Sequence, residues 1–113
     1  MYYFLKNSNI TIKTGESLTV NEIEHAWQCF ESGLKHYPAM VIIDFSELSS
    51  IDSAGIGFLV KIQKKTKIYC VNLVLTGMSD SLKRLFSITG ILPFFKILTE
   101  EELRLFSHEC VLY

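Results

Sequence analysis

The chain has 113 residues and a formal net charge of -1, with 49% hydrophobic and 20% charged residues. This length fits one domain, residues 1–113, and the balance of apolar and charged residues excludes a disordered chain and a general nucleic-acid-binding surface. The first residues lack the pattern of a signal peptide, and no apolar run reaches the length of a membrane span. We therefore expect a cytoplasmic domain that does not insert into a membrane.

The cysteines indicate neither a disulfide framework nor a metal site. Cys29, Cys70 and Cys110 are odd in number and widely spaced, without a CxxC pair. We expect them to be reduced packing residues, in a protein that needs no metal or cofactor.

The first third of the chain predicts a β-hairpin followed by a helix. Residues 2–6 and 9–13 are predicted strands, joined by a turn at Asn7 and Ser8. Thr19 and Glu22 have the spacing of a capping box, which predicts the start of a helix there. The inward face of that helix is expected to carry Ile23, Ala26, Trp27, Phe30 and Leu34. Tyr37 precedes Pro38 and should stop the helix, because the residue before a proline disfavours helical backbone.

The middle of the chain predicts a central strand and a second helix. Residues 40–43 are continuously apolar, as required of a strand covered on both faces. The residues from Asp52 and Ser53 onward predict a helix whose inward face carries Ile56, Leu59, Val60 and Gln63. Its last turn holds Lys64, Lys65 and Lys67, cations that suit the carboxyl end of a helix dipole.

The last third predicts two more strands and two more helices. Residues 71–76 form a strand, and Ser79 caps a helix that Gly90 ends, with inward-facing Leu82, Leu85, Phe86 and Ile88. Residues 94–97 form a short strand, and both Phe94 and Phe95, like Trp27, are expected in the core. Thr99 and Glu102 repeat the capping box before a helix that ends at about Ser107.

The predicted order is therefore β-β-α-β-α-β-α-β-α. Alternating strands and helices imply right-handed crossovers and a largely parallel or mixed sheet with helices on at least one face. The fold class is α/β: a single domain with a mixed β-sheet of about five strands and about four helices.

The stretch IDSAGIG, residues 51–57, is the strongest candidate site. Asp44 and Ser46 end the central strand, and Asp52 and Ser53 begin the next helix, so all four are expected at the strand ends where ligands and partners bind in α/β sheets. A helix amino terminus tolerates a phosphate, so Ser53 suits phosphorylation. Spacing alone favours a simpler interpretation, in which a serine or aspartate before a helix only caps it.

The glycines of this stretch give a second signal. Gly55 and Gly57 lie in the first turns of the predicted helix, where each costs about 1 kcal/mol relative to alanine. Close approach of another backbone or of a partner would compensate for that cost.

The segment VIIDFSELSSIDSAGIGFLVKIQK resembles the core of STAS domains, especially bacterial anti-sigma factor antagonists, and residues 79–98 resemble the family's third helix and last strand. The resemblance implies that a partner anti-sigma factor serine kinase phosphorylates Ser53 and that a phosphatase resets it. It also implies that the unphosphorylated protein binds that kinase, frees a sigma factor and regulates transcription, without being an enzyme itself. The motif positions that match the family are Asp44, Ser46, Asp52, Ser53, Gly55 and Gly57. We expect Ala54 and Ile56, and Gly77, Met78 and Ser79 at the end of the next strand, to complete the partner-binding surface.

The chain departs from the family near its amino terminus. Family members often carry a Gly-x-Leu-Asp motif on a loop that contacts the kinase, whereas this chain has Gly15-Glu16-Ser17-Leu18. Without the aspartate, the usual contact set is in doubt, which leaves room for a different partner within the family.

Other interpretations are weaker. An enzyme is the rival class, but Ser53 lacks the pattern of a nucleophile elbow, and His25, His36 and His108 form no recognisable triad with it. A receiver domain with Asp44 as phosphate acceptor would need an acidic pair after the first strand, which is absent.

A non-phosphorylated STAS module, as an accessory of a transporter or a scaffold in a signalling assembly, stays open as the alternative function. The lysines of residues 61–67 are expected on a solvated helix end. The apolar strand at residues 2–6 is able to pair with a second copy, so a homodimer stays open too.

Overall fold

The computed structural model describes the backbone of residues 1–111 and the side chains of residues 1–105. Its main sheet has the strand order β1-β2-β4-β6-β7. The strands are β1 (Tyr2–Lys6), β2 (Asn9–Lys13), β4 (Met40–Asp44), β6 (Asn72–Thr76) and β7 (Lys96–Ile97). β1 is antiparallel to β2, and all other neighbours are parallel. The predicted α/β class, mixed sheet and central strand are confirmed.

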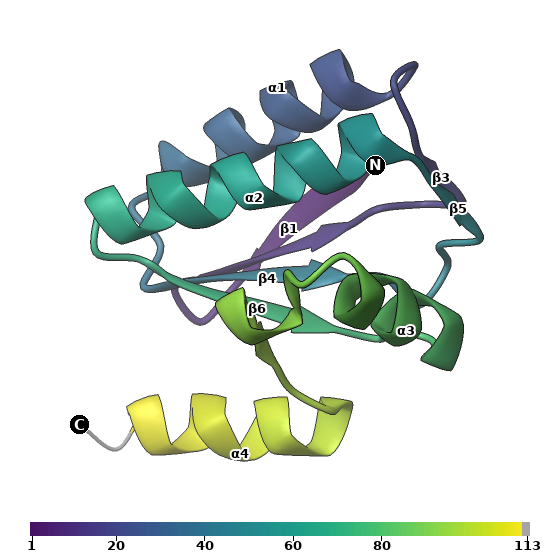
Figure 1. The fold of residues 1–113 in the computed structure, drawn as a ribbon. Coiled ribbons are helices and arrows are strands. Elements are labelled where there is room, and N and C mark those ends of the chain that lie inside the picture. The colour runs from purple at the N-terminus through teal and green to yellow at the C-terminus, as the bar shows by residue number, and fades with distance from the viewer. Residues whose placement is uncertain (112–113) are drawn as a thin grey trace.

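A second, very short sheet was not predicted. β3 (Ser17–Leu18) pairs in parallel with β5 (Ser50–Ile51), and the pair lies beyond the ends of the main strands (Figure 1). Strands of two residues carry no detectable alternation, so the sequence pattern gave no signal for them.

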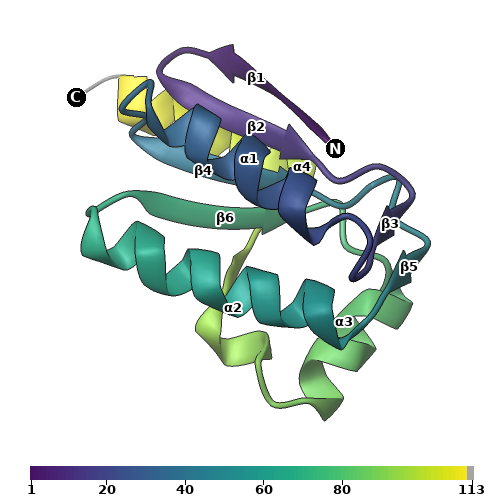
Figure 2. The same cartoon turned by 90° about the horizontal axis from the view of Figure 1, so that it is seen from above.

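Helices cover both faces of the main sheet unequally. α1 (Ile23–Leu34), α2 (Ser53–Ile68) and α3 (Asp80–Ile88) lie on one face, and α4 (Glu100–Val111) lies on the other (Figures 1 and 2). A single turn of 3₁₀ helix, η1 (Leu92–Phe94), precedes β7. The mixed sheet is therefore the middle of three layers.

The position of β4 in the middle of the sheet, with helices on both faces, explains why its sequence is continuously apolar. Val41 and Ile43 point into the main core beneath α1, α2 and α3, whereas Met40 and Ile42 form a second cluster with Val74. Leu98 and Leu103 pack on that second cluster from the α4 side. Both faces of the strand are buried, as predicted from the absence of alternation.

Several local signals in the sequence are confirmed. The hairpin turns through Asn7 and Ser8, which take positive φ values of 50° and 68°. The Ser79 hydroxyl accepts a hydrogen bond from the Leu82 amide, 3.1 Å, and Gly90 follows α3 with φ 77°. Reciprocal bonds between Thr99 and Glu102, 3.0 and 3.1 Å, form the capping box of α4, which extends to Val111 rather than to about Ser107.

The capping box predicted for the first helix is wrong. The Thr19 hydroxyl donates to the Glu22 carboxylate, 2.8 Å, instead of accepting from the Glu22 amide. α1 begins at Ile23, with Glu22 rather than Thr19 at the capping position. The helix ends at Leu34, and Tyr37, which takes a left-handed φ of 51°, continues the turn toward Pro38.

The predicted inward face of α2 is also wrong in part. Its buried residues are Gly55, Phe58, Leu59, Ile62 and Thr66. Only Leu59 was predicted, while Ile56, Val60 and Gln63 are half-buried. The inward face begins with Gly55 and ends with Thr66. Neither residue type is apolar in the sense used to detect helical periodicity, so the pattern of apolar residues predicted a different face.

Three single residues differ from their predicted burial. Ile88 and Phe94 are 76% and 63% exposed, because α3 turns Ile88 to solvent and Phe94 lies in η1 instead of in a strand. Phe95 is buried as expected. Cys29 is a buried free thiol, but Cys70 is exposed with φ 58° and is not a packing residue; the Cys110 and His108 side chains lie outside the described ones.

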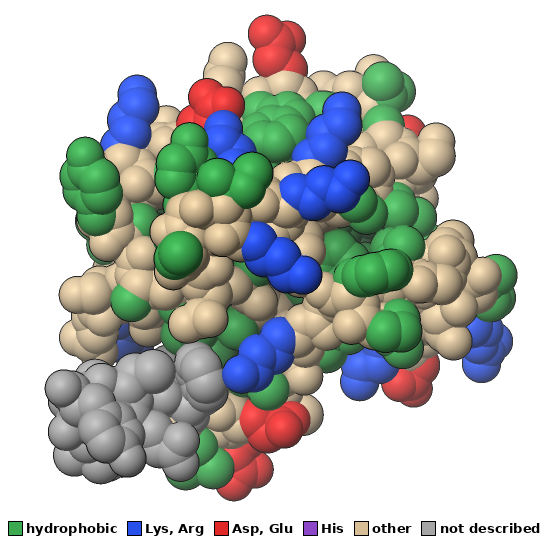
Figure 3. Space-filling view, turned by 60° about the vertical axis from the view of Figure 1, so that its left-hand side comes forward, with side chains coloured by type: hydrophobic (Ala, Val, Ile, Leu, Met, Phe, Trp, Pro, Cys, Tyr) green, Lys and Arg blue, Asp and Glu red, His purple; other side chains and the backbone are tan. Residues whose placement is uncertain are grey.

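Figure 3 shows the end of the molecule at which α1 and α2 terminate. Basic side chains are scattered there among hydrophobic ones instead of forming one patch. Lys65 pairs with Glu31 at 3.5 Å and lies 5.7 Å from the Trp27 ring centroid. Within the part of the chain that the structure describes, no helix combines the length and apolar character needed to cross a membrane.

The observed α2 packing gives a stability prediction. Ile62 is fully buried and Val60 only partly, although both are β-branched residues of the same helix. We expect Ile62→Ala to lower the free energy of unfolding by about 2–5 kcal/mol, because it leaves a cavity in the core. Val60→Ala is expected to cost clearly less. Urea denaturation of the two variants measures both losses, and a loss for Val60→Ala that equals or exceeds the other would contradict the assigned face.

Candidate partner-binding site

Asp52 caps α2 and ties it to a distant loop. One carboxylate oxygen, Oδ1, accepts from the Gly55 amide, and the other, Oδ2, accepts from the Val20 amide, both at 3.0 Å. These amides, Val20 first and then Gly55, lower the pKa of Asp52, because they stabilise its charged form. The carboxylate therefore joins two segments that lie 32 residues apart in the chain.

Ser53 is the first residue of α2 and is exposed. Because Asp52 occupies the capping position, the Ser53 hydroxyl has no capping role, and it makes no hydrogen bond to any of residues 1–105. The interpretation of Ser53 as merely a helix cap is thus wrong for this residue. Its hydroxyl is free to react or to contact a partner.

The two glycines of the stretch have different surroundings. A Cβ added at Gly55 would overlap the Leu18 carbonyl oxygen and lie 2.8 Å from Ile51 Cγ1. At Gly57 a Cβ would meet nothing within 4 Å. Close approach of another backbone explains Gly55, as the sequence suggested, but leaves Gly57 available to a partner.

The short β3–β5 sheet holds the loop of residues 15–22 against the start of α2. The Ser49 amide donates to the Glu16 carbonyl at 2.8 Å, and the Asp52 amide donates to the Leu18 carbonyl at 3.4 Å. The segment in which the family motif differs is thus attached directly to the segment that carries Ser53.

Glu22 supplies a carboxylate in this loop. It accepts hydrogen bonds from the hydroxyls of Ser17 and Thr19, and these donors lower its pKa. Glu22 also lies near enough to Asp52 for the two charges to oppose each other. The surroundings of Ser53 are therefore acidic.

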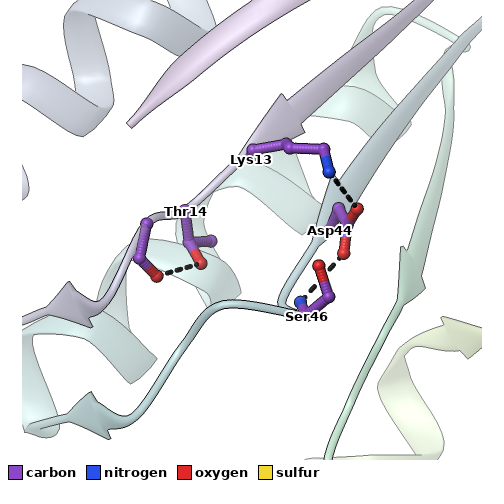
Figure 4. Close-up of polar contacts among 5 residues, drawn as sticks. Lys13, Thr14, Asp44 and Ser46 are labelled. Carbon is purple, nitrogen blue, oxygen red and sulfur yellow. Dashed lines mark hydrogen bonds and ion pairs between the residues drawn. The ribbon is translucent and has the colours of Figure 1, made fainter.

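Asp44 has a different setting at the end of β4 (Figure 4). Its Oδ1 accepts from the Ser46 amide at 2.9 Å, and its Oδ2 pairs with Lys13 Nζ at 3.3 Å. The bond with Asp44 raises the pKa of Lys13. Gly77, with φ 71°, lies so close that an added Cβ would be 2.6 Å from Asp44 Oδ1. The Asp44 side chain, the Ser46 backbone and Gly77 are thus in close contact with one another at the ends of β4 and β6.

The predicted site residues therefore form two groups at the same end of the sheet. Asp44 follows Met40 and Ile42 at the period of a strand, so it lies on the α4 face, whereas Ser53 begins a helix on the opposite face. Met78 packs partly against the main core, and the Ser79 hydroxyl is used to cap α3. The structure brings Asp52, Ser53, Gly55 and Gly57 together but gives no direct contact between Ser53 and Asp44.

Sequence reasoning missed Val20 and the role of Glu22. Val20 is 67% exposed, although it is apolar and its amide is fixed by Asp52. No local pattern could have found it, because its link to the site joins residues distant in sequence. The spacing of Thr19 and Glu22 did mark Glu22 in the sequence, but it predicted a capping box instead of a carboxylate that accepts from the hydroxyls of Ser17 and Thr19.

The histidines with described side chains have other contacts. His25 Nε2 lies 3.0 Å from the Met1 carbonyl oxygen, and the His36 ring lies 6.2 Å from that of Tyr3. Neither contacts Ser53. Among the described residues, no group of three or more His, Cys, Asp or Glu side chains is arranged to hold a metal ion.

Comparison with known proteins gives a family model, described as STAS domain, that matches residues 6–105. The anti-sigma-B factor antagonist of Listeria monocytogenes is 44% identical over 55 residues, which are 49% of this chain and 48% of that protein. The match thus spans about half the length of this curated relative.

Solved structures extend the likeness to nearly the whole fold. The anti-sigma factor antagonist SpoIIAA in its unphosphorylated form has a TM-score of 0.72 at 20% identity, over 88% of both chains. The phosphorylated form of Bacillus SpoIIAA has a TM-score of 0.67 at 20% identity, over 88% of this chain and 91% of that one. A sulfate transporter family protein from Wolinella succinogenes has a TM-score of 0.82 at 13% identity, over 97% and 93%.

The glycine geometry predicts opposite effects of the same substitution. Gly55→Ala should lower the free energy of unfolding by about 1–3 kcal/mol, because its Cβ overlaps the Leu18 carbonyl. Gly57→Ala is the matched control, and it should leave stability unchanged or raise it by up to about 1 kcal/mol through helix propensity. Urea denaturation compares them, and equal losses would contradict the proposed difference.

The Asp52 bonds predict a stability difference that depends on pH. The folded-state pKa of Asp52 is below its usual 3.8, so its contribution to stability is present above that value. It is lost as the pH falls through the lowered folded-state pKa. We expect Asp52→Ala to be less stable than the wild type at neutral pH, with a difference that shrinks in strong acid. Urea midpoints measured along a pH series check this, and a difference independent of pH would contradict it.

Proposed function

Because the chain belongs to the STAS domain family, we propose that it is an anti-sigma factor antagonist whose binding to a partner is switched by phosphorylation of Ser53. The observation that carries the proposal is the exposed Ser53 hydroxyl, which has no structural hydrogen bond because Asp52 caps the helix. The names of the relatives support the same class of function. The proposed protein is a substrate and a ligand, not an enzyme.

The proposed partner is an anti-sigma factor serine kinase in the cytoplasm. In its unphosphorylated form the protein binds this kinase, which then releases a sigma factor and so changes transcription. The kinase phosphorylates Ser53, and a phosphatase resets it. SpoIIAA, a structural neighbour, is known in both phosphorylated and unphosphorylated forms, which supports a switch of this kind.

The proposed contact surface surrounds the start of α2. Ser53 is exposed, while Ala54, Ile56 and Gly57 are half-buried and line the first turns of the helix. Val20 adds an exposed apolar side chain from the neighbouring loop, and Met78 borders the surface. Asp52, Gly55, Asp44, Ser46, Gly77 and Ser79 are proposed to act mainly by shaping and supporting it.

A phosphate at Ser53 would change this surface by its charge and leave the fold intact. A phosphoserine adds about -1.5 to -2 charges at neutral pH, and the helix amino terminus tolerates them. The added charge lies beside Asp52 and near Glu22, so a partner surface that complements the unmodified site would meet excess negative charge. Like-charge contact or desolvation of the phosphate against the partner costs on the order of several kcal/mol, and about 1.4 kcal/mol changes affinity tenfold, so we expect one phosphate to weaken binding by orders of magnitude.

A non-phosphorylated STAS module is the second candidate function. It is favoured by the TM-score of 0.82 to the sulfate transporter family protein. In that case the same surface would bind a transporter or a signalling assembly without phosphate transfer.

Phosphate transfer from labelled ATP in a lysate of the source cells tests the switch. We expect label on the wild type and none on Ser53→Ala, because that substitution removes the acceptor hydroxyl. Ser50→Ala is the matched control, since Ser50 is an exposed serine in β5, shortly before Ser53 in the chain, and it should be labelled like the wild type.

The remaining outcomes separate the two functions. Label on both the wild type and Ser53→Ala would place the acceptor elsewhere and overturn the proposed site. Absence of label together with capture of a partner that also binds Ser53→Asp would favour the static module.

A further inference from the structure

The two edges of the main sheet are unequal. β7, at one edge, has only two residues, whereas β1, at the other edge, has five and pairs with β2 alone. Within residues 1–111, the outer backbone N–H and C=O groups of β1 have no strand partner. Short strands, prolines and charges normally protect such edges, but β1 has only Lys6, at its end.

The β1 side chains are unusually apolar for an exposed edge. Tyr2, Phe4 and Leu5 are 51%, 41% and 49% exposed. Phe4 and Lys6 lie on the α4 side of the sheet, where they line a groove of about 1200 Å³ beside that helix. Tyr3 lies on the other side, with its ring 6.2 Å from that of His36. Apolar groups are thus available on both faces of the strand.

The sequence of β1, YYFLK, is self-complementary when it pairs antiparallel about Phe4. Such a pairing places Phe4 opposite the same residue of the second copy, Tyr3 opposite Leu5, and Tyr2 opposite Lys6. The single charge of each strand then lies opposite a tyrosine instead of another cation, a pairing that allows a cation–π contact and avoids like-charge repulsion. Lys13, next to Tyr2 on β2, is already paired with Asp44.

We propose that two copies of the chain associate through β1, antiparallel and with a two-fold axis at Phe4, so that their sheets join into one. The occupant of this edge is therefore a second copy, because the strand complements itself in side chains and charge. A two-fold contact closes on itself, so it buries both β1 edges, and the joined sheet then ends on each side at β7, which has only two residues.

The geometry of this dimer separates the two sites around Ser53. Antiparallel pairing of β1 reverses the second copy, so the strand ends that carry the site point to opposite ends of the joined sheet. Each copy can then bind a partner without contact between the partners. The association does not depend on phosphorylation, so its test is independent of the proposed switch.

Sedimentation equilibrium of the unphosphorylated chain tests the proposal with charges placed at the two-fold axis. The wild type should dimerise, and Phe4→Lys and Phe4→Glu should each raise the dimer Kd at least about tenfold, because like charges then lie directly opposite each other. Mixing these two variants should restore a dimer, because only opposite charges then meet. Ile88→Lys is the control: Ile88 is 76% exposed on α3, away from β1 (Figure 2), and the variant should dimerise like the wild type.

Three results would overturn the proposal. A monomeric wild type would leave the β1 edge to another partner, and a dimer that survives Phe4→Lys would use another surface. Failure of the two oppositely charged variants to associate, with both folded by circular dichroism, would show that residue 4 does not face itself.

Discussion

The contact between the Leu18 carbonyl and Gly55 sets the position of the candidate site. Only a residue without a Cβ allows α2 to begin this close to β3. Once it does, the Asp52 carboxylate reaches both Gly55 and Val20, and the Asp52 amide reaches Leu18. The capping position is then filled, so the next residue, Ser53, is held at the surface with its hydroxyl unused. The contact between the Leu18 carbonyl and Gly55 thus allows Asp52 to cap the helix, which leaves the Ser53 hydroxyl without a capping bond.

The sheet separates the residues that we propose support the site from those that we propose contact a partner. On the α4 side, Asp44 joins Lys13 and Ser46 and lies against Gly77, which fixes the ends of β2, β4 and β6. On the other side, Ser53 and Val20 are exposed around the start of α2. A partner that binds around Ser53 therefore meets a surface whose framework is stabilised from the opposite face. The outer edge of β1 is a further surface, which carries exposed apolar side chains and pairs with no strand within residues 1–111.

Local signals in the sequence were reliable where the interaction itself is local. The turn at Asn7 and Ser8, the Ser79 cap and the Thr99–Glu102 capping box each involve residues at most a few positions apart. The same spacing at Thr19 and Glu22 predicted a capping box that does not form. There the Glu22 carboxylate accepts from the hydroxyls of Thr19 and Ser17, since β3 brings Ser17 close to it.

The sequence by itself determined the order of the five main strands and the four helices, the buried central strand and the candidate stretch that contains Ser53, because periodicity, caps and a family motif all lie in neighbouring residues. The two-residue strands β3 and β5 and the turn η1 left no such pattern. Only the tertiary structure decided which face of α2 is buried, that Asp52 rather than Ser53 caps it, and that Asp44 lies on the far side of the sheet. Those features depend on contacts such as that of Asp52 with Val20, across 32 residues. Such contacts arise only when packing brings separate segments together, so no local pattern of residue types specifies them.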